Sequence, residues 1–400
     1  MDEASIGRRI ARARKLRENP LTQAGLAVRV PCSKSLISQV ERGHKPATPS
    51  LIAAVARALN VDVTELTGQP YGAGNGRPAD RIHAAIPAIR QALVYWDIPP
   101  GLDAPPRPLP ELGRVARRAG DLRMQAGYTE LGSLLPGLIK ELTVHAHQDH
   151  GRDRDRSFRL LADAYSAVDS MSSKLGYMDL FALAVERMAW AAARADDPLL
   201  RPAAAMRRSS AFLSAGAWDG GLTLLERAGH DLDDGSAGDP ATLSVLGTVH
   251  LRAAVMAARG GMTSTAWEHA GYAREVADRI GRDTKDYGLL FGPTNVSIHE
   301  VAIAVELGDA DEAVRRSRDL TLPADLPRER SSHHYIDLSR AWLWQGDTSR
   351  ALACVAEAER LAPQRTRYHP MARETVRKLL DMQRRLPEQL RIVAARMGLS

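Results

Sequence analysis

Hydrophobic and polar positions in the first 70 residues follow a helical period and are interrupted by short polar turns. Ile6 and Ile10 belong to an apolar stripe in an otherwise basic stretch, which predicts a helix over Ile6–Leu16. Thr22 and Ser33 are suited to cap the next two helices, because a short side-chain oxygen accepts a bond from the first helical turn. The later helices are predicted at Gln23–Val30, at Lys34–Glu41, at Ser50–Leu59 and in a short stretch opened by Asp62.

From Ala79 onward the apolar pattern remains helical, and alternating runs typical of β-strands are missing. Similar segments, each opening with Gly after an apolar stretch, recur at intervals of roughly 38 to 49 residues, starting at Gly127, Gly176, Gly216, Gly261, Gly308 and Gly346. Glycine ends a helix by adopting a positive φ, and helix pairs must stack to bury their apolar faces. We therefore expect an all-α chain with stacked helix pairs, the alternative being a bundle of Gly-terminated helices.

Two segments break this pattern. The Gly-rich stretch 71–78 predicts a flexible linker, which divides the chain into domains at 1–70 and 79–400. Pro99–Pro110 contains six prolines and is expected to be extended, after a helix over Pro87–Trp96. The chain contains no run of about 18 apolar residues, so the sequence does not predict a helix that spans a membrane. Cys32 and Cys354 lie far apart, which favours a reduced, cytoplasmic chain.

The net charge of +6 is concentrated at one end of the 400 residues. Residues 1–66 contain eleven Lys or Arg and six Asp or Glu, whereas the rest of the chain is almost balanced. Arginine-rich codon usage alone would spread the excess evenly. The asymmetry predicts a small anion-binding module on a nearly neutral body.

The second and third predicted helices are joined by a short turn, which is the arrangement of a helix-turn-helix. Ile37 and Val40 would anchor the third helix to the core. The outward side chains of that helix are then Lys34, Ser35, Ser38 and Gln39. Each can hydrogen-bond to a base edge or a phosphate, and none is acidic. This face favours nucleic-acid binding over a helical module that binds protein.

The segment resembles the Xre (phage-repressor-like) family of helix-turn-helix DNA-binding domains. The likeness lies in Leu21-Thr22-Gln23, Leu26-Ala27, Ile37-Ser38-Gln39-Val40-Glu41-Arg42-Gly43, Pro49-Ser50-Leu51 and Ala56-Arg57-Ala58-Leu59. It implies that the third helix enters the major groove of double-stranded DNA, with Lys34, Ser35 and Gln39 contacting bases and Gln23 supporting them. It implies phosphate contacts from Ser33, Arg42, His44 and Lys45. Pro31 replaces the usual turn glycine, so the turn must differ locally.

The whole chain is similar to actinobacterial Xre regulators that carry degenerate tetratricopeptide-like repeats. The likeness lies in residues 66–71, 291–313 and 358–363. It implies a cytoplasmic, nucleoid-associated transcription regulator. Regulators of this type are usually homodimers that read two half-sites. A concave repeat surface suits a signalling peptide, a small molecule or a partner protein as the ligand.

One candidate ligand site stands out in the second half. Phe291, Asn295 and His299 recur at a spacing of four residues, which places them on one helix face if Gly292-Pro293 starts the helix. An aromatic ring, an amide and an imidazole together would clamp a peptide backbone, and Tyr287 is a further candidate. The alternative is that these side chains hydrogen-bond between helices of the body.

Other clusters do not predict chemistry. His145, His147 and His150 lack the spacing and the fourth ligand of a zinc site, and Asp231–Asp239 lacks the alternation of a calcium loop. We expect no metal, no cofactor and no enzymatic activity. The leading hypothesis is a regulator whose repeat domain senses a ligand and dimerises. The competing hypothesis is a DNA-tethered scaffold. A long buried apolar groove with Asn or Arg along it would favour sensing, and a broad exposed apolar face would favour the scaffold. A deep polar pocket with clustered titratable groups would favour an enzyme.

Overall fold

The protein is described by a computed structural model over residues 5–17, 19–30, 32–71, 81–233, 238–383 and 385–399. Nearly all secondary structure in these ranges is α-helical. The one β-pairing among them is an isolated antiparallel bridge between Thr284 and Phe291. The predicted all-α class is confirmed.

The first five helices form a unit that we call the head. They are α1 (Ile6–Lys15), α2 (Gln23–Arg29), α3 (Lys34–Glu41), α4 (Pro49–Leu59) and α5 (Val63–Thr67). Thr22 and Ser33 accept hydrogen bonds from the first turns of α2 and α3, as the sequence predicted. Asp62 and Glu65 form a reciprocal capping box on α5. The fourth helix begins one residue earlier than expected, because Thr48 caps it and Pro49 occupies its first turn.

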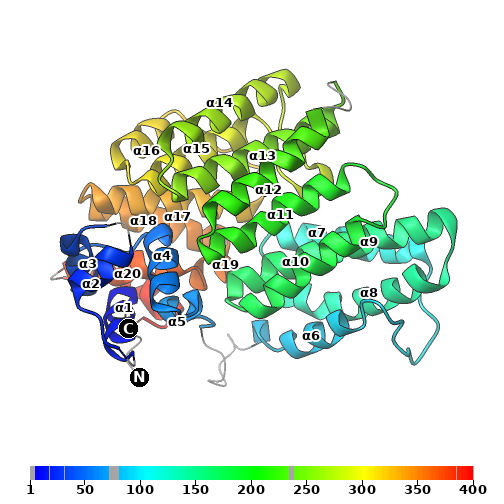
Figure 1. Ribbon diagram of the computed structural model, residues 1–400, viewed down its shortest axis with the longest axis horizontal. Helices are drawn as coiled ribbons and strands as arrows, with labels where there is room; N and C mark the ends of the chain where they lie inside the picture. Colours follow the sequence, from blue (N-terminus) through cyan, green and yellow to red (C-terminus); the bar gives the residue numbers. More distant parts are fainter. Residues whose placement is uncertain are drawn as a thin grey trace.

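The remaining helices form the body. They are α6 (Ile86–Val94), α7 (Leu109–Met124), α8 (Tyr128–Gln148), α9 (Gly151–Leu175), α10 (Met178–Ala192), α11 (Leu200–Ala215), α12 (Trp218–Asp233), α13 (Pro240–Arg259), α14 (Thr263–Ile280), α15 (Pro293–Leu307), α16 (Ala310–Ser317), α17 (Arg328–Trp344), α18 (Thr348–Leu361), α19 (Pro363–Arg367), α20 (Pro370–Met382) and α21 (Glu388–Met397). Figure 1 shows them as an arc that starts at α6 at the lower edge of the view, rises through α11–α15 and returns to the head at α20.

From α7 to α18 each helix packs against its neighbour in the chain. Gly176, Gly216, Gly261, Gly308 and Gly346 adopt φ values between 67° and 88° at the predicted helix ends. The prediction for Gly127 is wrong, because its φ is −85° and Ala126 takes the positive φ of 56° instead. Helix α7 ends at Met124, three residues before the repeat glycine.

The expected interruptions lie near their predicted places. Helix α6 starts at Ile86 with Pro87 in its first turn, and the proline-rich stretch is non-helical until α7 begins at Leu109. Of the predicted linker, only Tyr71 lies within the described residues. Its side chain is 3% exposed and packs in the core of the body. The rest of that linker, and Pro31 in the helix-turn-helix turn, lie outside the described residues.

Helix α13 is the most apolar long helix of the described chain. By length and composition alone it would suffice to cross a membrane, with a mean hydropathy of 1.4. However, 78% of this stretch is buried inside the body, between α11, α12, α14 and α15. This burial is the arrangement of a core helix.

The head packs directly on the C-terminal helices of the body. The apolar core of α1–α5 continues into side chains of α17, α18, α20 and α21, and Figure 1 shows α20 beside the head. Hydrogen bonds also join the units at separate points. Lys378 donates to the carbonyl of Gly43 at 2.5 Å, and Arg57 donates to the carbonyl of Gly216 at 2.8 Å.

Candidate DNA-binding face and internal cavity

The predicted DNA-binding residues of the head lie together on α3 and beside it. Ile37 and Val40 are buried against the head core, which turns the opposite side of α3 outward. Lys34 and Ser35 are exposed, while Ser38 and Gln39 are half-buried. The exposed flanking side chains are Ser33 before the helix and Arg42, His44 and Lys45 after it. This face therefore offers cations, hydroxyls and an amide without a carboxylate.

Gln23 is held in place by a buried ion pair that sequence reasoning missed. Arg14 and Glu41 pair at 2.7 Å with little solvent exposure, and Gln23 donates from Nε2 to the same Glu41 carboxylate at 2.8 Å. Burial alone would raise the pKa of Glu41, but the hydrogen bonds from Arg14 and Gln23 lower it. The bond fixes the orientation of the Gln23 amide at the start of α2.

Gln39 is positioned by its own helix. Its Nε2 donates to Ser35 Oγ at 3.3 Å, one turn earlier. Arg42 donates from Nε to the carbonyl of Ser38 at 3.2 Å, which aligns its guanidinium along the end of α3. These weak, exposed bonds are readily exchanged for bonds to a base or a phosphate.

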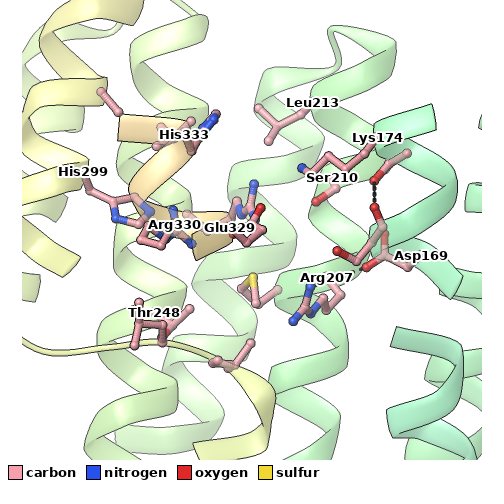
Figure 2. Close-up of a pocket in the computed structure, with 18 of the residues that line it drawn as sticks. Asp169, Lys174, Arg207, Ser210, Leu213, Thr248, His299, Glu329, Arg330 and His333 are labelled. Carbon is pink, nitrogen blue, oxygen red and sulfur yellow. Dashed lines mark hydrogen bonds and ion pairs between the residues drawn. The ribbon is translucent and has the colours of Figure 1, made fainter. Parts of the chain in front are cut away.

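A cavity of about 300 Å³ lies inside the arc of the body. Its walls come mainly from the odd-numbered helices α7, α9, α11, α13, α15, α17 and α19. Figure 2 shows His299, Glu329, Arg330 and His333 on one wall, facing Asp169, Lys174 and Arg207 on the other. The charged residues that line it are Arg123, Asp169, Lys174, Arg207, Arg252, Arg259, Glu306, Glu329, Arg330, Asp337 and Arg365.

Two of the four residues predicted as a ligand site line this cavity. Gly292-Pro293 does start α15, and Asn295 and His299 reach the cavity from its first two turns. Phe291 precedes the helix, so it does not share their face; it is fully buried against α13. Tyr287 lies apart from the cavity, and its hydroxyl donates to Asp197 at 2.9 Å. The sequence prediction extended the spacing of four residues back to Phe291, although Phe291 precedes the helix start that it assumed at Gly292-Pro293.

His299 is a neutral hydrogen-bonding group. Burial, with a smaller effect from nearby Arg330, lowers its pKa to about 3. Because its Nδ1 lies 2.8 Å from the carbonyl oxygen of Asn295, Nδ1 must carry the proton and donate. The pKa values of His333 and His369 are also lowered by burial and by neighbouring cations. The three imidazoles of the cavity are therefore uncharged at neutral pH.

The charged lining was not predicted from the sequence. It comes from helices far apart in the chain, so no local spacing reveals it. One signal was present: Arg252 is the one charged residue in the apolar stretch LRAAVMAA of α13. A single cation inside a buried apolar helix is rare unless it is paired or faces a polar cavity.

The histidines weighed as metal ligands have other partners. His145 lies 2.8 Å from Asp149 and from the carbonyl of Arg107, while His147 contacts the carbonyl of Trp96. Within the described ranges, no group of three His, Cys, Asp or Glu side chains is arranged to hold a metal ion.

Comparison with known proteins identifies the head. Residues 6–67 match the helix-turn-helix domain family. No curated protein matches the chain. Among solved structures, the crystal structure of Bacillus thuringiensis PlcR in complex with the peptide PapR7 and DNA has a TM-score of 0.33 and 12% identity, over 88% of this chain and 99% of that chain.

The match and the geometry together define a class. The chain carries an N-terminal helix-turn-helix domain followed by a body of stacked helices. The polar face of α3 lies within the matched residues and is exposed. These findings support a DNA-binding transcription regulator.

Proposed function

We propose that this regulator is of the Xre type, that it binds DNA sequence-specifically with α3 in the major groove, and that its body senses a ligand. The observation that carries the DNA-binding proposal is the exposed face of α3, where Lys34, Ser35, Ser38 and Gln39 project beside three exposed basic or imidazole side chains. Lysine suits the O6 and N7 atoms of guanine, and glutamine suits the N6 and N7 atoms of adenine.

We further propose that the protein acts as a homodimer on two half-sites. A single domain of this size makes few phosphate contacts, whereas helix-turn-helix dimers read half-sites about 34 Å apart. The nearly balanced charge of the body supports the assignment of phosphate binding to the head.

The proposal is tested by two alanine variants of the head. Gln39→Ala should relax base preference, because it removes a base contact worth about 1–3 kcal/mol of discrimination. Lys45→Ala should weaken binding to all sequences and reduce the salt dependence by about one phosphate contact. Both effects are measured as DNA affinity over a range of salt concentrations.

Lys285→Ala is the matched control, because Lys285 is an exposed lysine of the body. It should leave affinity, base preference and salt dependence as in the parent protein. If Gln39→Ala and Lys45→Ala also bind like the parent, α3 is not the recognition helix.

A contact between head and body supports the sensing proposal. Gln69, just after α5, donates from Nε2 to the carbonyls of Lys174 and Tyr368, at 3.3 Å each. Lys174 lines the cavity, and Tyr368 precedes His369, which lines it too. A ligand that moves these walls would move the point at which the head is attached. It would thereby change how often the head adopts each of its orientations on DNA.

The described surface favours sensing over recruitment. Its large exposed apolar side chains belong to short, separate stretches of the chain, at the end of α1, in α2, in the α6 region and in the C-terminal segment. The cavity is deep and polar, which also calls for a comparison with an enzyme site. The hydroxyls of Ser173, Ser214 and Thr248 on its walls donate to carbonyls of their own helices rather than to a base, which favours binding over nucleophilic catalysis.

A further inference from the structure

The carboxylates of the cavity are all engaged by cations. Glu306 pairs with Arg259 and Arg340 at 3.2 and 3.1 Å. Glu329 pairs with Arg365 at 2.6 Å. The other two carboxylates are those of Asp169, which lies 3.7 Å from Arg207, and Asp337, which lies 3.3 Å from Arg340. No negative charge on these walls is left over to neutralise further cations.

Among the described residues, four cations of the cavity remain without such a partner, and one of them, Arg123 on α7, donates instead to the carbonyl of Gly288 at 2.6 Å. The other three, Lys174 on α9, Arg252 on α13 and Arg330 on α17, form no ion pair with a carboxylate in the described part of the chain. Arg330 Nε is buried without a hydrogen-bond partner. The three side chains belong to three different helices that line one cavity. Figure 2 shows Lys174 and Arg330 on facing walls of it.

Placing these cations together is costly unless a negative charge lies between them. Burial, and then the charge of Arg365, lowers the pKa of Lys174 to about 7. Burial likewise lowers the pKa of Arg252 to about 10, and Arg207 adds to that effect. All three side chains are half-buried, and a protein retains mutually repelling cations in such a cavity where an anion offsets them.

Neutral polar groups complete the lining. Asn295 is 1% exposed, and its Oδ1 has no hydrogen-bond partner. His299 uses Nδ1 on its own helix, which leaves Nε2 as an acceptor. These acceptors suit hydroxyl or amide groups on the uncharged part of a ligand.

We propose that the cavity binds a compact anion with at least two negative charges on carboxylate or phosphate groups, held by Lys174, Arg252 and Arg330. A volume of about 300 Å³ is at the small end of ligand pockets and suits a metabolite rather than a long peptide. The inference deepens the proposed function, since it names the class of ligand that the body senses and rests on that function for any effect on DNA.

The test uses the full-length protein with inorganic phosphate and citrate as probes, each compared with sodium chloride at equal ionic strength. Binding to the folded state raises the melting temperature. We expect at least one probe to raise it by about 3 °C or more beyond chloride. Phosphate acting alone indicates a phosphorylated ligand, and citrate acting alone indicates a polycarboxylate; both support the proposal.

Arg252→Gln and Lys174→Met should each reduce probe affinity at least tenfold without lowering the melting temperature of the unliganded protein, because each removes a repelling cation. Arg350→Gln is the matched control, since Arg350 is an exposed arginine of α18 far from the cavity lining. It should bind the probe like the parent. Because two cavity variants are used, misfolding of one leaves the other to decide.

The proposal is overturned if neither probe exceeds chloride, or if the cavity variants bind the probe as tightly as Arg350→Gln. DNA affinity is measured on the same samples. If the protein binds DNA but neither anion, the cavity assignment alone is overturned. If it binds an anion and its DNA affinity does not change, the anion site is supported and the sensing role is contradicted.

Discussion

At the scale of single residues, two close approaches depend on the absence of a side chain. Helix α1 crosses α3 so closely that a Cβ on Gly7 would lie 2.0 Å from the carbonyl oxygen of Val40. In the body, a Cβ on Gly247 would lie 1.9 Å from Cζ of Phe291. Phe291 is fixed in that position by its β-bridge to Thr284. Phe291, which sequence spacing suggested for ligand contact, is thus a packing residue of α13 and α15.

This packing predicts that Gly247→Ala destabilises the body. The added methyl must displace a fully buried ring, and such overpacking costs about 1–3 kcal/mol of the free energy of unfolding. Urea denaturation followed by circular dichroism measures the effect.

Gly271→Ala on the neighbouring α14 is the control, because a Cβ there meets open space. Alanine should be neutral or stabilising there by up to about 1 kcal/mol, because it favours the helix. Equal stability of the two variants would show that Phe291 does not pack on Gly247.

At the scale of elements, local signals predicted the head well. Capping side chains such as Thr22, Ser33 and Asp62 mark helix starts in the sequence itself, so the predicted and observed bounds agree closely. In the body, the repeat glycines located helix ends because a positive φ, which glycine adopts readily, ends a helix; Gly127 is the exception. The cavity was not predictable in this way, since Lys174, Arg252 and Arg330 are brought together only by the stacking of distant helices.

The segment after α5 predicts how head and body are coupled. Gln69→Ala removes both hydrogen bonds to the cavity walls. If these bonds transmit ligand binding, the change in DNA affinity on adding the bound anion should shrink at least threefold, because the two units then move more independently. The measurement is DNA affinity with and without the probe.

Gln125→Ala, an exposed glutamine at the end of α7, serves as the control and should keep the full response. A response that is equally large in both variants would contradict transmission through Gln69.

At the scale of the whole molecule, the arc of helices returns the C-terminus to the head. The cores of the head and of α17–α21 are continuous, so the head is supported by the end of the chain rather than only by the segment that precedes the body. Composition predicted a basic head on a nearly neutral body. It could not predict the contact between the head and α17–α21, because that contact depends on how far the arc of helices turns back. The molecule therefore combines an exposed polar face on α3 with a charged cavity inside the body.

The central claim is sequence-specific DNA recognition by α3. It is tested most directly by selecting DNA from a random-sequence pool with the full-length protein and sequencing the bound fraction. We predict an enriched motif of two related half-sites spaced by about one helical turn or a multiple of it, with Gln39→Ala losing preference at one position in each half-site. A bound fraction without any enriched motif, or a motif unchanged by Gln39→Ala, would contradict the account.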